Sequence, residues 1–308
     1  METWWREAGE LDEDQLRVIG LPAEGSFLVK GPPGSGKTNL LILRANYLTN
    51  AEHPNLAVVV FTRTLQEFIR GGADRYDFDP RNVLTSRLLL DRLLREAGCP
   101  YEGTDNFEED RAGRLAAAEA MLAQAPLYDV LLLDEAQDFL PGEIRLFRRL
   151  ARDLFMVADS RQQIYGSGSK LAELGAVADR TLELRFHYRN GHPICEVADG
   201  IGRSFSAGYE PVLPTCNYNS PGFQPSVELV QASFAEQAQQ IAQRLQLQRR
   251  TYPEGLLGVI CPRSDNARAL TQALKDADFS DDLCIQDQDG SRSIAIGKPI
   301  WVSTVHAA

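Results

Sequence analysis

Residues 31–38 read Gly31-Pro32-Pro33-Gly34-Ser35-Gly36-Lys37-Thr38, and they follow the apolar run Phe27-Leu28-Val29 with Lys30 in between. This stretch decides the fold, because it matches the phosphate-binding loop pattern G-x-x-x-x-G-K-S/T at every fixed position and is followed by the helix-like segment 40–45. Glycines let the backbone N–H groups face phosphate, and a following helix N-terminus favours negative charge. Lys37 is predicted to reach the outer phosphates and the Thr38 hydroxyl to hold magnesium. The sequence therefore predicts binding of a nucleoside triphosphate by residues 31–38.

An acidic pair comes later in the chain, at the end of another apolar run. Residues 128–133 are predicted to form a buried strand, and Asp134 and Glu135 follow it. Asp134 can hold magnesium through water, and Glu135 can orient and deprotonate an attacking water. Such a pair is a weak signal alone and a strong one after a complete phosphate-binding loop.

Apolar and β-branched runs alternate with helical patterns on both sides of these motifs. Strands are predicted at 56–62, 82–85, 152–159, 227–230, 256–260 and 299–306, and helices at 63–70, 86–97, 111–124, 234–248 and 265–277. This alternation predicts an α/β fold with parallel sheets covered on both faces. The segment 207–225, rich in Pro, Gly, Asn and Ser, is predicted to be a loop or linker.

Composition bounds the class of protein. The 308 residues are enough for about two domains, and no apolar run approaches the roughly 20 residues of a membrane span. The net charge of −11 counts against a protein that coats nucleic acid nonspecifically. The five cysteines are scattered, odd in number and without C-x-x-C spacing, so neither disulfides nor a zinc site is expected. We expect a cytoplasmic protein that does not contact a membrane.

The segment before the phosphate-binding loop allows two interpretations of Gln15. Asp12 is a candidate helix N-cap, with Gln15 at the capping-box position. An amide can also read a purine edge, because it offers both a donor and an acceptor. Spacing alone favours the helix cap.

Several motifs, taken in order, resemble those of superfamily 1 helicases of the UvrD/Rep type. The resemblance covers most of the chain and rests on residues 31–38, 61–63, 85–87, 134–138, 159–165, 184–189 and 302–308. It implies a P-loop NTPase with two RecA-like parallel-sheet domains and the cofactors ATP and Mg²⁺. The first domain would span 1–180, with a small helical insertion at about 76–125. The second would span 181–308, apparently truncated and without a large insertion.

The resemblance also implies roles for individual residues. Gln15 would read adenine, which reverses the preference for a cap, and Tyr188 would stack on adenine. Gln162 would sense the γ-phosphate, and Arg189 would reach it from the second domain, beside the catalytic Lys37 and Glu135. Contacts with nucleic acid are expected from Phe61, Thr62, Arg63, Thr85, Tyr165 and His306. For Phe61, ordinary core packing is an equal alternative.

Two functions from different classes follow from these motifs. The first is an ATP-dependent translocase or helicase on single-stranded DNA, with RNA left open. The second is an ATP-gated regulatory or partner-binding module of a DNA-repair or phage-defence complex. The motif resembling the family's fifth stops at Ala308, so the sequence is expected to be the N-terminal portion of a longer protein or to be completed by a protein partner. A small-molecule kinase ranks last, because it does not explain the sequence Asp-Glu-Ala-Gln-Asp at 134–138.

Overall fold

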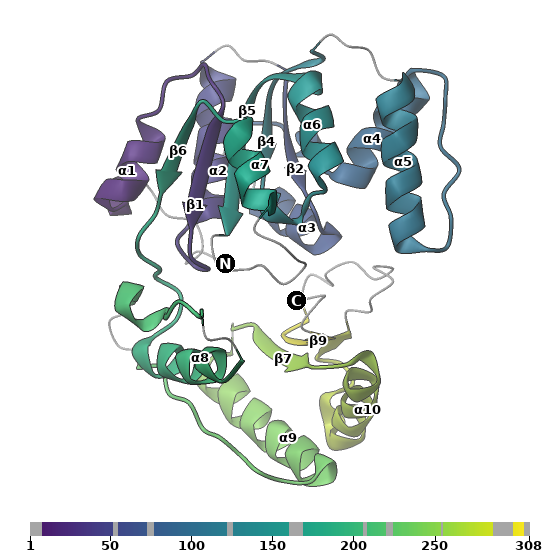
Figure 1. The fold of residues 1–308 in the computed structure, drawn as a ribbon. Coiled ribbons are helices and arrows are strands. Elements are labelled where there is room, and N and C mark those ends of the chain that lie inside the picture. Colours follow the sequence, from purple (N-terminus) through teal and green to yellow (C-terminus); the bar gives the residue numbers. More distant parts are fainter. Residues whose placement is uncertain are drawn as a thin grey trace. The chain divides into compact units, whose positions relative to one another are not determined.

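A computed structural model gives the arrangement of the chain (Figure 1). It describes residues 8–51, 55–72, 77–121, 126–159, 169–205, 208–219, 224–253, 255–285 and 298–304. The chain divides into two compact units, Met1–Val227 and Glu228–Ala308. Three residues with predicted roles, Gln162, Tyr165 and His306, lie outside the described residues.

The first unit is built on a six-stranded sheet in the order β3-β2-β4-β5-β1-β6. Its strands are β1 (Phe27–Gly31), β2 (Leu56–Val60), β3 (Val83–Thr85), β4 (Tyr128–Leu133), β5 (Ala151–Asp159) and β6 (Arg180–Glu183). Every neighbouring pair is parallel. All five residues of β2 are buried, as expected for a parallel strand covered on both faces. The predicted α/β architecture is confirmed for this unit.

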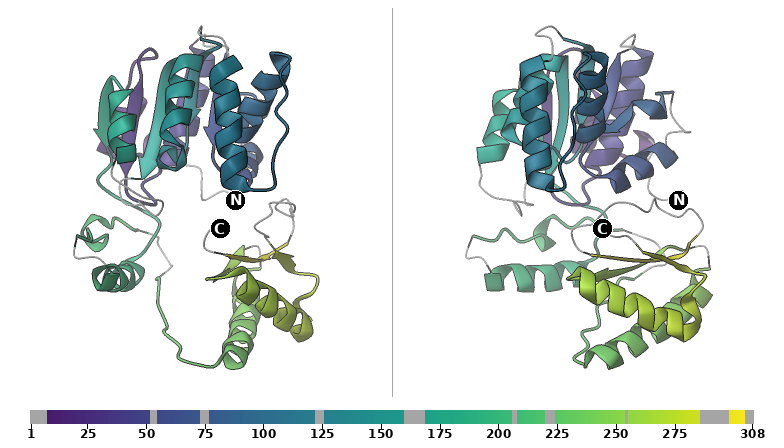
Figure 2. Two further views of the ribbon diagram at one scale, coloured as in Figure 1. Left: turned by 45° about the vertical axis from the view of Figure 1, so that its right-hand side comes forward. Right: turned by 90° about the vertical axis from the view of Figure 1, so that its right-hand side faces the viewer.

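Helices cover both faces of this sheet (Figure 2). One face packs against α1 (Glu13–Ile19), α2 (Lys37–Asn50) and α3 (Arg63–Gly72). The other packs against α4 (Ser86–Glu96), α5 (Phe107–Met121), α6 (Pro141–Leu150) and α7 (Ser169–Ala176). The unit also contains α8 (His192–Phe205) and the short 3-10 helices η1 (Ala8–Glu10), η3 (Pro80–Asn82), η4 (Ala136–Asp138) and η5 (Leu213–Thr215).

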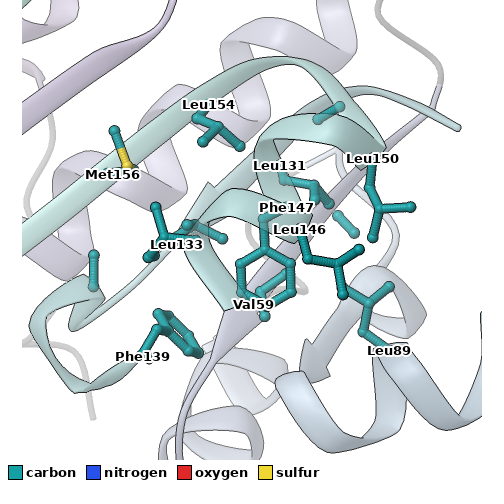
Figure 3. Packing of buried hydrophobic residues seen from close by; sticks show 14 of the residues in the cluster. Val59, Leu89, Leu131, Leu133, Phe139, Leu146, Phe147, Leu150, Leu154 and Met156 are labelled. Carbon is teal, nitrogen blue, oxygen red and sulfur yellow. The ribbon is translucent and has the colours of Figure 1, made fainter. Parts of the chain in front are cut away.

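Alternate residues of each strand enter opposite cores, as the period of a strand requires. Leu131 and Leu133 of β4 pack with the α4–α7 side, and Val130 and Leu132 pack with the α1–α3 side. Figure 3 shows Leu131 and Leu133 near Phe147 of α6. Burial on both faces holds the strands in place. The candidate site lies at the carboxyl ends of these strands.

The second unit is smaller and also has a parallel sheet. It contains α9 (Phe234–Thr251), β7 (Leu257–Cys261), α10 (Ser264–Leu274), the π-helical turn η6 (Lys275–Phe279), β8 (Leu283–Ile285) and β9 (Ile300–Thr304). The strand order is β7-β9-β8, and both pairs are parallel. Its core joins α9 and α10 to the sheet through residues such as Leu245, Leu270 and Val302.

The units divide at a different point from the expected boundary at 180/181. β6 pairs with β1 in the first sheet, so the chain after residue 180 continues within the first unit as far as Val227. Within the expected insertion at 76–125, β3 is a strand of the main sheet, paired with β2.

One predicted strand is wrong. The structure describes residues 227–230 and gives them no regular secondary structure. Leu229 is 82% exposed, so the apolar residues of this segment do not form part of a core. The short strands β6 and β8 were not predicted, because three or four residues carry too little periodicity to identify a strand.

Candidate nucleotide and magnesium site

The candidate site lies where three adjacent strands of the first unit end. β4, β5 and β1 are neighbours in the sheet, and Gly31 at the end of β1 is in register with Asp159 at the end of β5. Ligands of parallel α/β sheets bind at the carboxyl ends of the strands. Three groups therefore meet at the carboxyl ends of these strands: the loop 31–38, the pair Asp134 and Glu135, and Asp159.

The backbone of the 31–38 loop depends on two glycines. Gly34 has a φ of 81° and Gly36 a φ of 85°, in the left-handed region that favours glycine. Gly36 is the N-cap of α2, and the Ser35 N–H donates to the Pro32 carbonyl at 3.2 Å. A Cβ on Gly34 would lie 2.8 Å from Cβ of Arg189. The loop is thus shaped both by its own glycines and by the neighbouring segment around residue 189.

Substituting Gly34→Ala is expected to weaken ATP binding by about 10-fold or more, because the new Cβ adds backbone strain of about 1–3 kcal/mol and displaces Arg189. Isothermal titration calorimetry measures the change. The matched control is Gly71→Ala, at a helical position with nothing within 4 Å of the added Cβ; it should leave ATP affinity unchanged. Equal affinities for both variants would contradict this account of the loop.

Lys37 is held inside the loop that precedes it. Its Nζ donates to the carbonyls of Gly31 at 3.0 Å and Pro32 at 2.9 Å. It also forms an ion pair of 3.4 Å with Asp159 Oδ2. The residue is only 6% exposed, so its ammonium group is already largely removed from water. A charge in this position interacts strongly with an anion brought into the loop.

Asp134 has the properties expected of a magnesium ligand. It is fully buried, its Oδ1 accepts from the Glu135 N–H at 2.9 Å, and among the described residues its Oδ2 has no hydrogen-bond partner. Burial, together with the charge of Glu135, raises the pKa of Asp134 to about 7, although a hydrogen bond with the Thr38 side chain acts in the opposite direction. A buried carboxylate oxygen beside a hydroxyl is the hard oxygen environment that Mg²⁺ prefers.

The raised pKa predicts that Asp134→Asn stabilises the metal-free protein at high pH. Between about pH 4 and pH 7 the folded state keeps a proton that the unfolded state has lost, so stability falls as pH rises. Asparagine has no such proton, and the variant should gain about 1–3 kcal/mol at about pH 8 and much less at about pH 5. Thermal melts at the two pH values without magnesium measure the gain. The same gain at both pH values would contradict the prediction.

Glu135 has an unusual backbone conformation, and its carboxylate is held by Gln137. Its backbone is left-handed, with φ 47° and ψ 49°, which is uncommon for a residue other than glycine and typical of functional sites. Gln137 Nε2 donates to Glu135 Oε2 at 2.8 Å, and Gln137 Oε1 accepts from the Asp159 N–H at 2.9 Å. The amide thus joins the ends of β4 and β5 and fixes the direction of the Glu135 carboxylate.

Helix α1 contacts the loop through Gln15. The capping box is formed: Asp12 Oδ1 accepts from the Gln15 N–H at 2.8 Å, and Gln15 Oε1 accepts from the Asp12 N–H at 3.1 Å. In addition, Gln15 Nε2 donates to the Ser35 carbonyl at 3.0 Å. The capping interpretation is confirmed, and the contact of Gln15 with adenine stays a prediction.

The chain after β6 passes directly beside the loop. The Leu184 N–H donates to the Lys30 carbonyl at 2.7 Å, and the Tyr188 N–H donates to the Gly34 carbonyl at 3.0 Å. The Tyr188 hydroxyl donates to the carboxylate of Asp12. Tyr188 is therefore held between the loop and α1.

A buried carboxylate of α1 holds the same segment from a second side. Arg185 Nε and Nη2 donate to Asp14 at 2.7 and 3.1 Å, and the hydrogen bond from Arg185 holds the pKa of Asp14 below its usual value. Arg189 follows, next to Gly34. Arg189 belongs to the same compact unit as the loop, which differs from the expectation that it reaches across from a second domain.

Phe61, at the end of β2, packs within the first unit. Its ring meets those of Phe107 and Phe139 edge to face, with centroids 6.5 and 6.2 Å away. The Arg111 guanidinium lies over the ring, 4.7 Å from its centroid. Phe61 is half-buried against the core, so the packing alternative describes its position in the structure.

Two of the other residues expected to contact nucleic acid act as helix caps. The Thr62 hydroxyl accepts from the Leu65 N–H at the start of α3, at 3.2 Å. Thr85 is 5% exposed, and its hydroxyl accepts from the Leu88 N–H, also at 3.2 Å. Arg63 is exposed at the first position of α3. Thr62 and Arg63 follow the carboxyl end of β2, at the same end of the sheet as the 31–38 loop. Thr85 is buried.

Sequence reasoning missed three residues that shape the site. Gln137 lies inside the 134–138 motif, so its place in that motif could have identified it as a site residue. Asp159 ends an apolar strand, the same signal that identified Asp134. Asp14 had no such signal, because its partner Arg185 is far away in the sequence.

Among the described residues no helix is long and apolar enough to cross a membrane. Comparison of the chain with models of known protein families, and with curated proteins, finds no match.

Proposed function

We propose that this chain binds and hydrolyses ATP with magnesium and that it is a motor of the superfamily 1 helicase type acting on single-stranded DNA. The observation that carries the proposal is the convergence of Lys37, Thr38, Asp134 and Glu135 at the carboxyl edge of one parallel sheet. A buried carboxylate oxygen of Asp134 without a hydrogen-bond partner among the described residues supports a metal there.

Each residue has a distinct part in the proposed reaction. Lys37 binds the phosphates by charge, and Thr38 and Asp134 offer oxygen ligands to the ion. Glu135 orients the attacking water and accepts its proton, and Gln137 keeps the Glu135 carboxylate in place. Magnesium, when bound, neutralises negative charge on the phosphates.

The DNA part of the proposal rests on the order of the motifs along the chain. Phe61, Thr62 and Arg63 follow β2, at the same end of the sheet as the nucleotide site. In this proposal their position would couple the bound nucleotide to contact with a DNA strand. Stacking and backbone contacts of this kind bind single strands of any sequence.

A second function is an ATP-gated module that binds a protein partner. It is favoured because side chains expected to contact DNA already have contacts within the first unit. Phe61 packs against the core, Thr85 is buried, and Thr62 caps α3. These side chains are already used within the unit, and the net charge of −11 adds no general attraction for nucleic acid.

Steady-state ATP turnover with and without single-stranded DNA separates the two functions. A motor should be stimulated by DNA, and the stimulation should fade as salt is raised, because phosphate contacts depend on salt. ATP binding with turnover that DNA does not change would contradict the motor and support the module. Failure to bind ATP would contradict both.

A further inference from the structure

A compact cluster of metal-binding side chains lies outside the nucleotide site. His187, Cys195 and Cys216 each offer a ligand atom, and these atoms all lie within 4.8 Å of one another. His187 is 2% exposed and Cys195 is 1% exposed, and Cys216 is half-buried. The three residues come from separate segments: the chain after β6, helix α8, and the chain after η5.

The imidazole of His187 has one ring nitrogen available as a metal ligand. Its Nε2 lies 3.0 Å from the Val212 carbonyl, and among the described residues its buried Nδ1 has no hydrogen-bond partner. With Nε2–H donated to the carbonyl, the lone pair is on Nδ1. A metal-bound histidine typically donates its other N–H to a carbonyl or carboxylate in this way.

The thiols converge on the same point. Cys195 Sγ and Cys216 Sγ both donate to the Asn190 carbonyl, at 3.5 and 3.1 Å. Cys195 Sγ lies 3.9 Å from His187 Nε2, the nitrogen beside the Val212 carbonyl, and the ligand atoms of the cluster all lie within 4.8 Å of one another. In a tetrahedral zinc site, bonds of about 2.3 Å to sulfur and about 2.0 Å to nitrogen place neighbouring ligands about 3.5 Å apart. Ligand atoms within 4.8 Å of one another therefore have to move closer by up to about 1.3 Å to reach that geometry.

We propose that His187, Cys195 and Cys216 bind one zinc ion, with water or the Asn190 carbonyl as the fourth ligand. Two thiolates and an imidazole favour zinc over magnesium or calcium, which prefer oxygen. Binding releases the two thiol protons to solvent, because the thiolate is the metal ligand. The sequence analysis expected no zinc site, because no short spacing motif links the three residues along the chain. The proposed site differs from that expectation.

Hydrogen bonds already join the segments that carry the cluster. The His187 N–H donates to the Thr215 carbonyl at 3.0 Å, and the Asn217 N–H donates to the His187 carbonyl at 2.8 Å. Buried Asp199 of α8 accepts from the Val212 N–H at 2.7 Å. Zinc would join these segments directly next to Tyr188, which contacts the 31–38 loop. We therefore assign the ion a structural role.

Metal content of the full chain, purified under reducing conditions, supplied with zinc and then desalted, tests the proposal. Wild type should retain about one zinc per chain. Cys216→Ser should lose it, and Cys284→Ser, the matched control at another half-buried free cysteine, should keep it. No zinc in wild type, or equal zinc in both variants, would overturn the proposal.

Alkylation of the wild-type thiols keeps the test independent of whether the variants fold. Zinc should protect the half-buried Cys216 from alkylation and leave the exposed Cys99 reactive, and a chelator should abolish the protection. Peptide mapping without reductant identifies the competing outcome, a disulfide between Cys195 and Cys216. If Cys216 reacts equally with and without zinc, or if Cys195 and Cys216 are found only as a disulfide in zinc-treated protein, no zinc site exists.

Discussion

Replacing Glu135 with glutamine is expected to lower ATP turnover by about 10²–10⁴-fold, the range associated with loss of a general base. Glutamine has almost the same shape, so the left-handed backbone at this position and the contact with Gln137 should remain. It cannot accept a proton from water. ATP affinity should stay close to that of wild type, because Glu135 is assigned to the attacking water and not to the phosphates.

Single-turnover hydrolysis together with equilibrium ATP binding measures both parts of this prediction. Glu108→Gln, at an exposed glutamate of α5, makes the same charge change away from the site and should leave both quantities unchanged. Turnover by Glu135→Gln within a few-fold of wild type would remove Glu135 from the proposed mechanism.

Replacing Lys37 with alanine is expected to lower both ATP affinity and turnover. A hydrogen bond to a charged group is worth about 1.5–3 kcal/mol, which corresponds to about 10- to 150-fold in affinity. Turnover should fall by about 10²–10³-fold further, because positive charge at the phosphates stabilises the transition state.

The interpretation of Lys37→Ala depends on the fold staying intact, because the ammonium also binds two loop carbonyls and Asp159. A thermal melt of the variant is therefore part of the measurement. Lys30→Ala removes the same charge from strand β1, close to the loop, and should retain ATP binding. If a folded Lys37→Ala protein bound ATP as tightly as wild type, the phosphates would have to lie elsewhere.

Strands β1 to β5 of the first unit could be predicted because burial on both faces leaves a simple pattern, whereas the mostly exposed β6 was not predicted. Continuous apolar runs mark β2 and β4, and the residues that follow each run lie at the carboxyl edge. Parallel pairing then brings the ends of separate strands together. The sequence therefore predicts that Lys37, Thr38, Asp134 and Glu135 lie just beyond the carboxyl ends of strands, and the structure places them there.

Contacts between distant segments could not be predicted in the same way. Pairing of β6 with β1 keeps Tyr188 and Arg189 in the first unit, and nothing local in the sequence reports that pairing. The bond from Gln15 to the Ser35 carbonyl likewise depends on how α1 packs. The cluster of His187, Cys195 and Cys216 was missed because the expectation relied on close cysteine spacing, whereas folding brings the three residues together.

A crystal structure of this chain with magnesium and a non-hydrolysable ATP analogue tests the central claim most directly. The account predicts that the β- and γ-phosphates lie within the 31–38 loop and contact Lys37, and that magnesium lies between Thr38 and Asp134. Glu135 should face the γ-phosphate. An analogue bound elsewhere, or a metal without Thr38 and Asp134 beside it, would contradict the account.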